Sequence, residues 1–270
     1  MPFTVSHVAA VLPATRFPLL RDPLILSAFA VGAMSPDVPY FVPFRLWSPE
    51  PHSWLGMVVL DVPITLALVA LYWLVLAAPL RALAPESIRA RLPRHVIAGH
   101  RATPGRTLAL LVVGAFIGAA THIVWDAFTH EGRFGVTAVP WLQADNVLGP
   151  LDGYLVLQYV CSALGLALVA WSIVNWFRRT PASSDVGPRL SWRWQSVAVV
   201  AVLMAGALAL WSVRELALSA NDLYDVRVLL VTGVTRSVTS IAVGVLVAAL
   251  CARIALLLRT QHGLNGTHVR

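Results

Sequence analysis

The chain consists of long apolar stretches separated by short polar connections. Five of these stretches, at about 55–80, 107–128, 152–177, 195–213 and 229–258, approach or exceed the roughly 20 residues that a helix needs to cross a bilayer. The pattern therefore predicts five transmembrane helices. Pro63 lies early in the first stretch and is expected to kink that helix.

The N-terminal region is also apolar, but prolines interrupt it. A short helix is expected from Thr4 to Leu12, where Pro13 ends it, and this helix is too short to cross a bilayer. The next apolar run, from Leu24 to Met34, covers only about 16 Å as a helix. Such a length suits a core or re-entrant helix better than a span.

The composition agrees with a membrane protein, because 58% of the residues are hydrophobic and only 12% are charged. Soluble domains carry about 25% charged residues. The predicted fold class is all-α, a polytopic helical bundle in a lipid bilayer. Cys161 and Cys251 lie in apolar segments, so we expect neither a disulfide framework nor a Cys-based zinc site. One membrane domain is expected, with an N-terminal segment at 1–54, core spans at 55–177 and two last spans at 195–258.

The net charge of +7 is the difference between twenty basic residues, all of them Arg, and thirteen acidic residues. They gather in the loops at 81–106 and 178–194 and in the C-terminal tail, whereas the connections at 129–151 and 214–228 are balanced or acidic. Alternating basic loops are typical of the positive-inside rule and not of a nucleic-acid-binding stripe, so no nucleic-acid partner is expected. The basic loops and the C-terminus are predicted to be cytoplasmic, which makes the later end of the second span extracytoplasmic.

That end of the second span carries ionisable side chains, in the sequence THIVWDAFTH at 121–130. His122, Asp126 and His130 are four residues apart, so they share one face of a helix. A charge at the centre of a membrane helix costs about 2.5–3.5 kcal/mol unless it is paired. Imidazole and carboxylate together are ligands for a divalent metal, and we therefore expect a metal site at this face of the bilayer.

The spacing limits how these ligands share ions. His122 and His130 are about 12 Å apart on a regular helix, so one ion cannot bind both. Asp126 then either bridges two ions or binds one ion together with His122. His130 serves a second ion or carries a proton. Two ions about 3.5–4 Å apart are the arrangement that clamps a phosphoryl group during displacement.

Further donors are predicted on the same side of the membrane. His52, Asp37 and Asp61 lie there, and His7 joins them if residues 23–45 do not cross the bilayer. Asp61, inside the first span, has three interpretations: a ligand, a partner that orients a ligand His, or a structural polar contact. The pair of His122 with Asp126 also has a structural interpretation, because such a pair can hydrogen-bond between helices.

Four motifs carry a resemblance to a known family. They are MPFTVSHVAAVLP, GAMSPDVPYF, PHSWLGMVVLDVP and THIVWDAFTH, in this order within the first 165 residues. Together they resemble the bacterial membrane family DUF4184. That family is distantly similar to the zinc-dependent phospholipase C and S1/P1 nuclease group and to the YdjM-type membrane hydrolases. The resemblance implies a location in the bacterial plasma membrane and a zinc-dependent attack of water on a phosphodiester.

The resemblance also implies a set of metal ligands. In the soluble enzymes an early His, an Asp, a His, a His-x3-Asp pair and a further His bind a cluster of zinc ions. Carried over to this sequence, the ligands are His7, Asp37, His52, His122, Asp126 and His130. A later His-x3-Glu pair of those enzymes is replaced here by Gln158 and Ser162, which are poor zinc ligands. One or two divalent ions, zinc by resemblance, are therefore expected instead of three.

Two functional hypotheses follow. The first is a membrane-embedded hydrolase in which metal-activated water attacks a phosphoester of a lipid or lipid-linked substrate. Asp37 or Asp126 would orient or deprotonate that water. The second is a non-catalytic scaffold or interaction protein, in which the same polar groups bond one another between helices.

Overall fold

The computed structural model describes residues 4–42, 50–92, 103–187, 189–217 and 223–265. The chain divides into two compact units, and each is described by itself. The first consists essentially of residues 3–69 and 99–178, and the second of residues 70–98 and 179–270. The expected single membrane domain stays a prediction. Residues 93–102 of the basic loop at 81–106, and the last residues of the basic tail, lie outside the described part.

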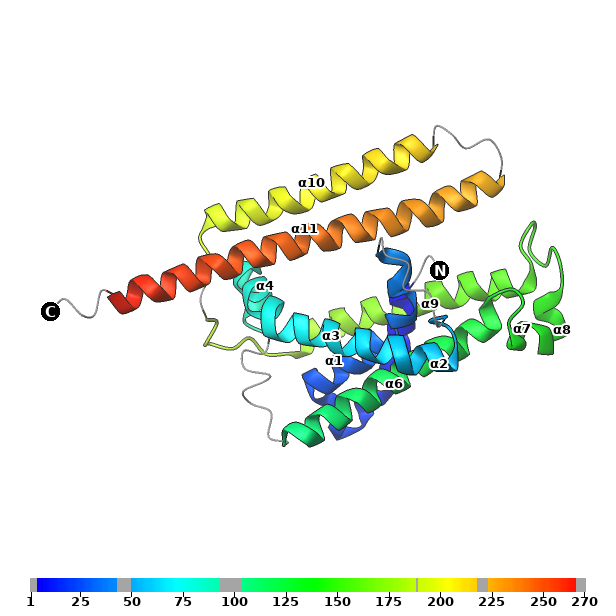
Figure 1. Ribbon diagram of the computed structural model, residues 1–270, viewed down its shortest axis with the longest axis horizontal. Coiled ribbons are helices and arrows are strands. Elements are labelled where there is room, and N and C mark those ends of the chain that lie inside the picture. The colour runs from blue at the N-terminus through cyan, green and yellow to red at the C-terminus, as the bar shows by residue number, and fades with distance from the viewer. Residues whose placement is uncertain (1–3, 43–49, 93–102, 188, 218–222, 266–270) are drawn as a thin grey trace. The chain divides into compact units, whose positions relative to one another are not determined.

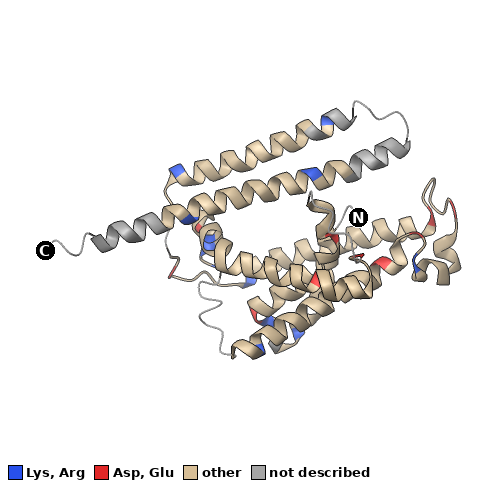
Figure 2. Ribbon diagram, viewed as in Figure 1, with Lys and Arg blue, Asp and Glu red and all other residues tan. Residues whose placement is uncertain are grey.

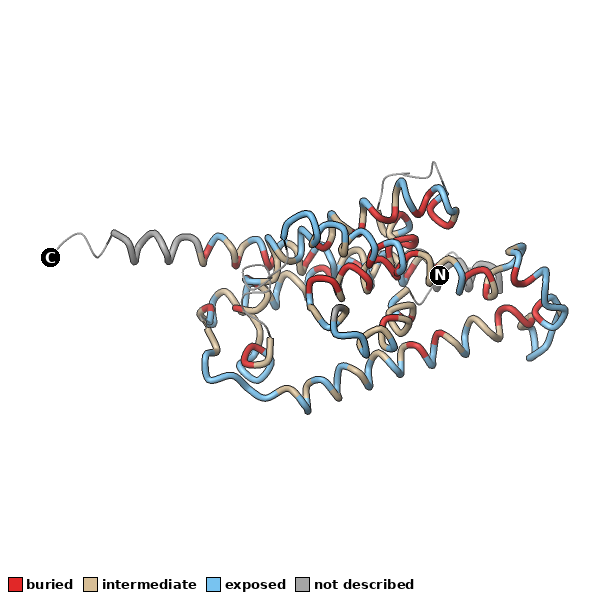
Figure 3. The backbone as a smooth tube through the Cα atoms, turned by 90° about the horizontal axis from the view of Figure 1, so that it is seen from below, coloured by how far each residue is buried: buried red, intermediate tan, exposed pale blue. Residues whose placement is uncertain are grey.

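Five helices are long and apolar enough to cross a membrane, which confirms an all-α multi-pass membrane protein. Their bounds are Trp54–Leu83, Pro104–Thr129, Gly153–Arg179, Trp192–Trp211 and Thr232–Leu256. Only 11–28% of each apolar window is buried inside the protein. Figure 3 shows the resulting exposed positions along the long helices, and Figure 2 shows how few of their described residues are charged. Exposed apolar surface of this extent matches a lipid solvent.

The N-terminal region of the first unit is a chain of short helices. These are the 3-10 helices η1 (Thr4–Val11), η2 (Pro13–Arg16) and η3 (Pro18–Arg21), then α1 (Pro23–Gly32) and the 3-10 helix η4 (Ser35–Phe41). The short helix expected from Thr4 therefore forms, and Pro13 begins the next one. Asp22 caps α1 by accepting hydrogen bonds from the backbone N–H groups of Leu24 and Ile25. The axis bends by 62° between α1 and η4, where the sequence predicted a break.

The first long helix is continuous but changes its winding. It comprises α2 (Trp54–Gly56), the π-helix η5 (Met57–Asp61), α3 (Val62–Ala70), the π-helix η6 (Leu71–Leu76) and α4 (Ala77–Leu83). The N–H of Val62 bonds the carbonyl of Met57, five residues back. This wider turn lies directly before Pro63, which has no N–H of its own to donate.

The rest of the first unit packs around α6 (Pro104–Thr129). Small residues let α1 lie very close to it: a Cβ added at Gly118 would stand 2.3 Å from the carbonyl oxygen of Phe29, and one at Gly32 would stand 2.5 Å from that of Ala115. After α6 follow α7 (Phe134–Ala138), α8 (Pro140–Gln143) and α9 (Gly153–Arg179). Gly165 of α9 allows a close approach of η1 in the same way, because a Cβ added there would stand 2.8 Å from the backbone carbonyl oxygen of Ser6.

The second unit contains a pair of long helices, α10 (Trp192–Ala217) and α11 (Leu223–Asn265), that run side by side (Figure 1). Their close approach again uses small side chains, since an added Cβ at Gly244 would meet Ala205 at 2.8 Å. The π-helix η6, α4 and the short helix α5 (Glu86–Arg89) complete this unit. A small core of Ala82, Leu190, Ala252 and Ala255 joins α4 to α11.

Candidate metal centre

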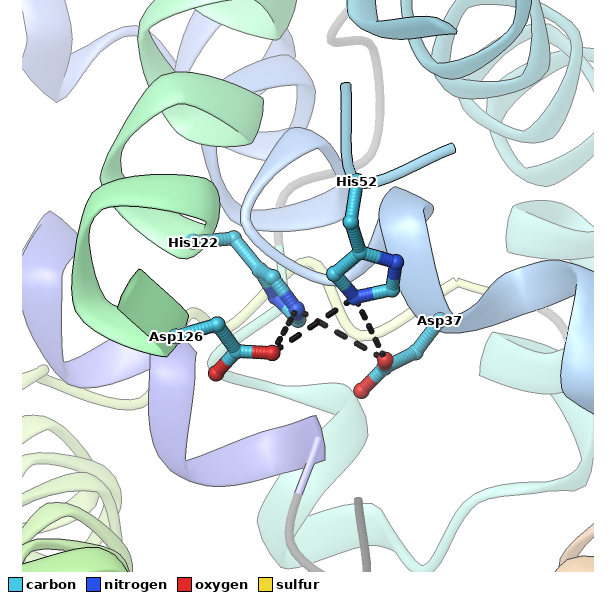
Figure 4. A group of neighbouring side chains, drawn as sticks. All are labelled: Asp37, His52, His122 and Asp126. Carbon is cyan, nitrogen blue, oxygen red and sulfur yellow. Dashed lines mark ion pairs between the residues drawn. The ribbon is translucent and has the colours of Figure 1, made fainter. Parts of the chain in front are cut away.

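Four side chains of the first unit converge on one point. Asp37 comes from η4, His52 from the segment before α2, and His122 and Asp126 from successive turns of α6. Figure 4 shows the side chains directed toward one another, and each offers one ligand atom within 4.8 Å of the others. All four are buried, none more than 5% exposed. We call this set the quartet.

The spacing within the quartet suits a tetrahedral ion. The His52 Nε2 atom lies 3.4 Å from Asp37 Oδ1 and 3.5 Å from Asp126 Oδ2. The His122 Nε2 atom lies 3.6 Å from Asp37 Oδ1 and 3.3 Å from Asp126 Oδ2. A tetrahedral zinc with metal–ligand bonds of 2.0–2.2 Å separates its ligand atoms by about 3.4 Å. The four distances are thus long for hydrogen bonds and match the edges of a coordination tetrahedron.

Three of the converging atoms are buried without a hydrogen-bond partner among the described residues: Asp37 Oδ1, His52 Nε2 and His122 Nε2. A buried polar atom without a partner is costly, so such atoms in a folded protein call for an explanation. A divalent cation bound between them satisfies all three at once. The donor set of two imidazoles and two carboxylates is suited to zinc.

The packing of α1 against α6 orients His122. Its Nδ1 atom lies 2.8 Å from the backbone carbonyl of Ala33, which can only accept, so Nδ1 carries the proton. The Nε2 atom is then left with its lone pair toward the quartet. A backbone carbonyl is a common partner for a metal-binding histidine. The close contact at Gly32 and Gly118 brings that carbonyl within reach.

Asp37 is oriented by a residue of the N-terminal helix η1. The hydroxyl of Thr4 donates to Asp37 Oδ2 over 2.6 Å, which leaves Oδ1 for the quartet. Thr4 begins η1, and its hydroxyl makes this longer-range contact. The contact joins η1 to η4, two elements that are far apart in sequence.

Local bonds also hold the segment that carries His52. Ser53 caps α2 by accepting from the N–H of Gly56, and its hydroxyl donates to the carbonyl of Glu50. Gly56 is required here because an added Cβ would lie 2.0 Å from that same carbonyl oxygen. Arg133 pairs with the Glu50 carboxylate at 2.8 Å and ties the segment to the chain beyond α6.

The other oxygen of Asp126 faces a second pair of histidines. His7 Nε2 and His130 Nδ1 each lie 3.5 Å from Asp126 Oδ1, while Oδ2 faces the quartet. Asp126 therefore stands between two groups of donors. The sequence placed His130 on the same helical face two turns on, but α6 ends at Thr129 and His130 has an extended backbone. This end of the helix lets the His130 ring reach back to Asp126.

Burial affects the titration of the histidines outside the spans. It lowers the pKa of His7 to about 4, with the neighbouring His122 ring adding to the effect. Burial likewise lowers the pKa of His130. Both imidazoles are therefore neutral at pH 7, which is the state that binds a metal. Burial also acts to lower the pKa of His52, but the neighbouring carboxylates of Asp126 and Asp37 outweigh this effect and raise the pKa.

Comparison with known families agrees with the resemblance of the four motifs. The family described as "Domain of unknown function (DUF4184)" matches residues 1–254. The chain belongs to the DUF4184 family. The match extends beyond the first 165 residues, where the motifs lie, and ends at residue 254, within the last span. Neither the curated proteins nor the solved structures contain a match to this DUF4184 protein.

The structure brings together all six residues that the sequence singled out, in two groups that share Asp126. His7 lies beside the quartet, with its ring stacked on that of His122 at a centroid distance of 3.8 Å. The side chains of the other four histidines of this DUF4184 protein lie outside the described part of the chain. They are His95, His100, His262 and His268. The membrane crossing of residues 23–45 stays open, because the bent pair of α1 and η4 is either a broken span or a re-entrant loop.

Two residues acquire a place that the sequence did not indicate. Gln158 of α9, which stands in the place of the later His-x3-Glu pair of the soluble enzymes, has its Nε2 atom 3.0 Å from His130 Nε2. Its correspondence to that pair was the available signal, and this correspondence alone does not indicate His130 as the partner. Asp61 is fully buried on η5, and neither carboxylate oxygen has a hydrogen-bond partner among the described residues. It is not one of the quartet.

Proposed function

We propose that this DUF4184 protein is a metal-dependent hydrolase that cleaves a phosphoester in a membrane lipid or lipid-linked substrate. The quartet holds a divalent cation, zinc by the chemistry of its donors. The observation that carries the proposal is the set of buried, unpartnered nitrogen and oxygen atoms at tetrahedral spacing. The resemblance to zinc-dependent phospholipases supports the choice of a phosphoester, and the five spans support a lipid substrate.

The residues divide the chemical work. Asp37 and Asp126 supply two negative charges that offset those of a divalent ion, while His52 and His122 bind as neutral ligands. When bound, such a cation supplies Lewis-acid chemistry, because it lowers the pKa of water toward 7 and neutralises charge on a phosphoryl group. His7 and His130 provide, with Asp126 Oδ1, a second position for an ion or a proton.

The reaction consists of one displacement at phosphorus. The oxygen of water forms a bond to phosphorus, and the ester bond to the lipid alcohol breaks. The water loses a proton toward the Asp126 side of the site, where the neutral imidazoles of His7 and His130 can hold it. The departing alcohol oxygen gains a proton in turn. Asp37, held by Thr4, orients the ligand sphere during this exchange.

The experiment combines metal content with activity. The full-length protein is purified in detergent, zinc is measured by elemental analysis, and hydrolysis is assayed on phospholipid and nucleotide substrates. We expect one or two zinc ions per chain and hydrolysis of the phospholipid. Asp126→Asn, which keeps the shape of the side chain, should lose the ion of the quartet and lower activity at least about 100-fold, as for other groups that act on the reacting centre. Asp145→Asn, in the exposed loop after α8, is the matched control.

One structural feature favours the alternative of a non-catalytic scaffold. The contacts of 3.3–3.6 Å also permit ion pairs between protonated histidines and the two aspartates. The scaffold hypothesis predicts that His122→Ala lowers thermal stability and leaves metal content unchanged. Sub-stoichiometric metal in the wild type, with Asp126→Asn and Asp37→Asn equal to it, would establish that alternative and overturn the hydrolase.

A further inference from the structure

An apolar pocket adjoins the second group of donors. It lies in the first unit, has a volume of about 390 Å³, and is lined by side chains of η1, α6 and α9. Ala10 contributes from η1, Trp125 and Phe128 from α6, and Leu157 and Cys161 from α9. The walls are almost wholly apolar, and no charged side chain lines them. The volume lies within the roughly 300–1,000 Å³ of small-molecule sites.

The pocket and the candidate metal centre share walls. Trp125 and Thr129 line the pocket and directly precede Asp126 and His130 in the sequence. The Thr129 hydroxyl lies 3.2 Å from His130 Nδ1, and the Trp125 ring stands edge-on to His7 at a centroid distance of 6.4 Å. Ala10 is three residues after His7 on a 3-10 helix, so both share one face of η1.

The third element repeats this relation. Leu157 and Cys161 line the pocket from α9, and Gln158, between them, contacts His130. Each of the three elements η1, α6 and α9 therefore presents apolar side chains to the pocket and carries a polar side chain next to the candidate metal centre. An occupant that fits is apolar along its length and carries a polar group at the end nearest His7 and His130.

The size of the pocket distinguishes between apolar occupants. One turn of an α-helix, about 10 Å across and 5.4 Å long, already fills about 420 Å³, which is about the volume of the whole pocket, so the pocket is small for a helix. A flexible hydrocarbon chain is much narrower. We propose that the pocket binds one acyl or alkyl chain of an amphiphilic phosphoester, whose phosphate reaches the donors of His7, Asp126 and His130. This inference rests on the proposed function, since it names the part of the substrate that the site recognises.

The direct test uses Cys161 as a reporter and does not require turnover. The full-length protein, in a steroid-based detergent that lacks a long alkyl chain, is alkylated with N-ethylmaleimide and the modified peptides are quantified by mass spectrometry. Hexadecyl phosphate should slow alkylation of Cys161 at least about tenfold, which corresponds to about 90% occupancy of the pocket. Cys251, in α11 of the second unit, is the internal control and should be unaffected. Butyl phosphate should protect neither cysteine.

A second arm fills the pocket. Leu157→Trp should lower kcat/KM about tenfold for a phospholipid with hexadecanoyl chains, because several CH₂ groups lose their burial. It should leave the dibutanoyl analogue and the zinc content unchanged. Leu164→Trp, at an exposed position of the same helix, is the matched control. Equal loss for both chain lengths, or no loss for either, would overturn the pocket as the chain site.

The two proposals fail in different ways. Absence of turnover of both lipids by the zinc-loaded wild type would count against the hydrolase, and the Cys161 arm would then decide the pocket alone. Protection of Cys161 by hexadecyl phosphate, without protection of Cys251, supports the chain site in that case also. Equal protection of both cysteines, or of neither, contradicts it.

Discussion

Asp126 is the residue on which both groups of donors depend. One carboxylate oxygen faces His52 and His122, and the other faces His7 and His130. Two further residues orient the donors. The Ala33 carbonyl keeps the proton of His122 on Nδ1, and the Thr4 hydroxyl fixes the rotation of the Asp37 carboxylate. Such supporting contacts commonly change metal affinity by 10–100-fold when they are removed.

Thr4→Val tests this support at the scale of one hydroxyl. The substitution keeps the shape of the side chain and removes the donor to Asp37 Oδ2, so the carboxylate is free to turn away from the quartet. We expect zinc affinity to fall about 10–100-fold, measured by competition with a chromogenic chelator. Thr137→Val removes an exposed hydroxyl of α7 and should have no effect. Equal affinity of both variants and the wild type would show that Thr4 has no orienting role.

At the scale of elements, the close packing of α1 on α6 places the site. Gly32, Ala33, Ala115 and Gly118 bring the two backbones together, and the Ala33 carbonyl thereby reaches His122. The end of α6 at Thr129 has a comparable effect on His130. Helix packing through small residues is a usual way to hold spans together in a membrane, where lipid is as apolar as the side chains.

Gly118→Ala tests the packing of these helices. The new Cβ would stand 2.3 Å from the Phe29 carbonyl oxygen, so α1 must move away from α6. We expect a loss of about 1–3 kcal/mol in stability, which is typical of overpacking, together with weaker zinc binding. Thermal unfolding in detergent measures the first effect and chelator competition the second.

Gly105→Ala is the control for this variant, because Gly105 lies in the same helix and no atom of the described residues lies within 4 Å of an added Cβ. Alanine is favoured over glycine in a helix by up to about 1 kcal/mol, so this variant should be as stable as the wild type or more stable. An unchanged melting temperature in Gly118→Ala would contradict the close packing.

For the whole molecule, the quartet links η4, the segment before α2, and α6, so an ion bound there should stabilise the folded chain. At a free metal concentration of about 100 times Kd, the stabilisation is about 2.7 kcal/mol. We expect a chelator to lower the Tm of the wild type and added zinc to restore it, as measured by scanning fluorimetry. Asp126→Asn should respond to neither treatment. A wild-type Tm that stays constant while its metal is removed would rule out this linkage.

The orientation in the membrane is a second prediction for the whole molecule. The positive-inside pattern places the loop after α9 in the cytoplasm and the loop after α8 outside. In a variant without Cys161 and Cys251, Asp145→Cys should react with a membrane-impermeant maleimide on intact cells, and Ser184→Cys should react after lysis alone. The reverse labelling would place the candidate metal centre on the cytoplasmic side.

The hydrophobic pattern determined the five spans, because lipid requires about 20 apolar residues in each crossing helix. The prolines after Met34 determined the break, and four sequence motifs indicated the family. The spacing of His122 and Asp126 likewise indicated one helical face. These features depend on residues that are close together in the chain, so the amino-acid sequence alone reveals them.

Only the tertiary structure decided how the donors divide into two groups around Asp126. The spacing predicted a regular helix as far as His130, whereas α6 ends one residue earlier and the His130 ring lies back against Asp126. The contacts of Thr4 with Asp37 and of Gln158 with His130 join residues 33 and 28 positions apart. Neither contact has a periodic signal, because both depend on how elements distant in sequence pack against one another.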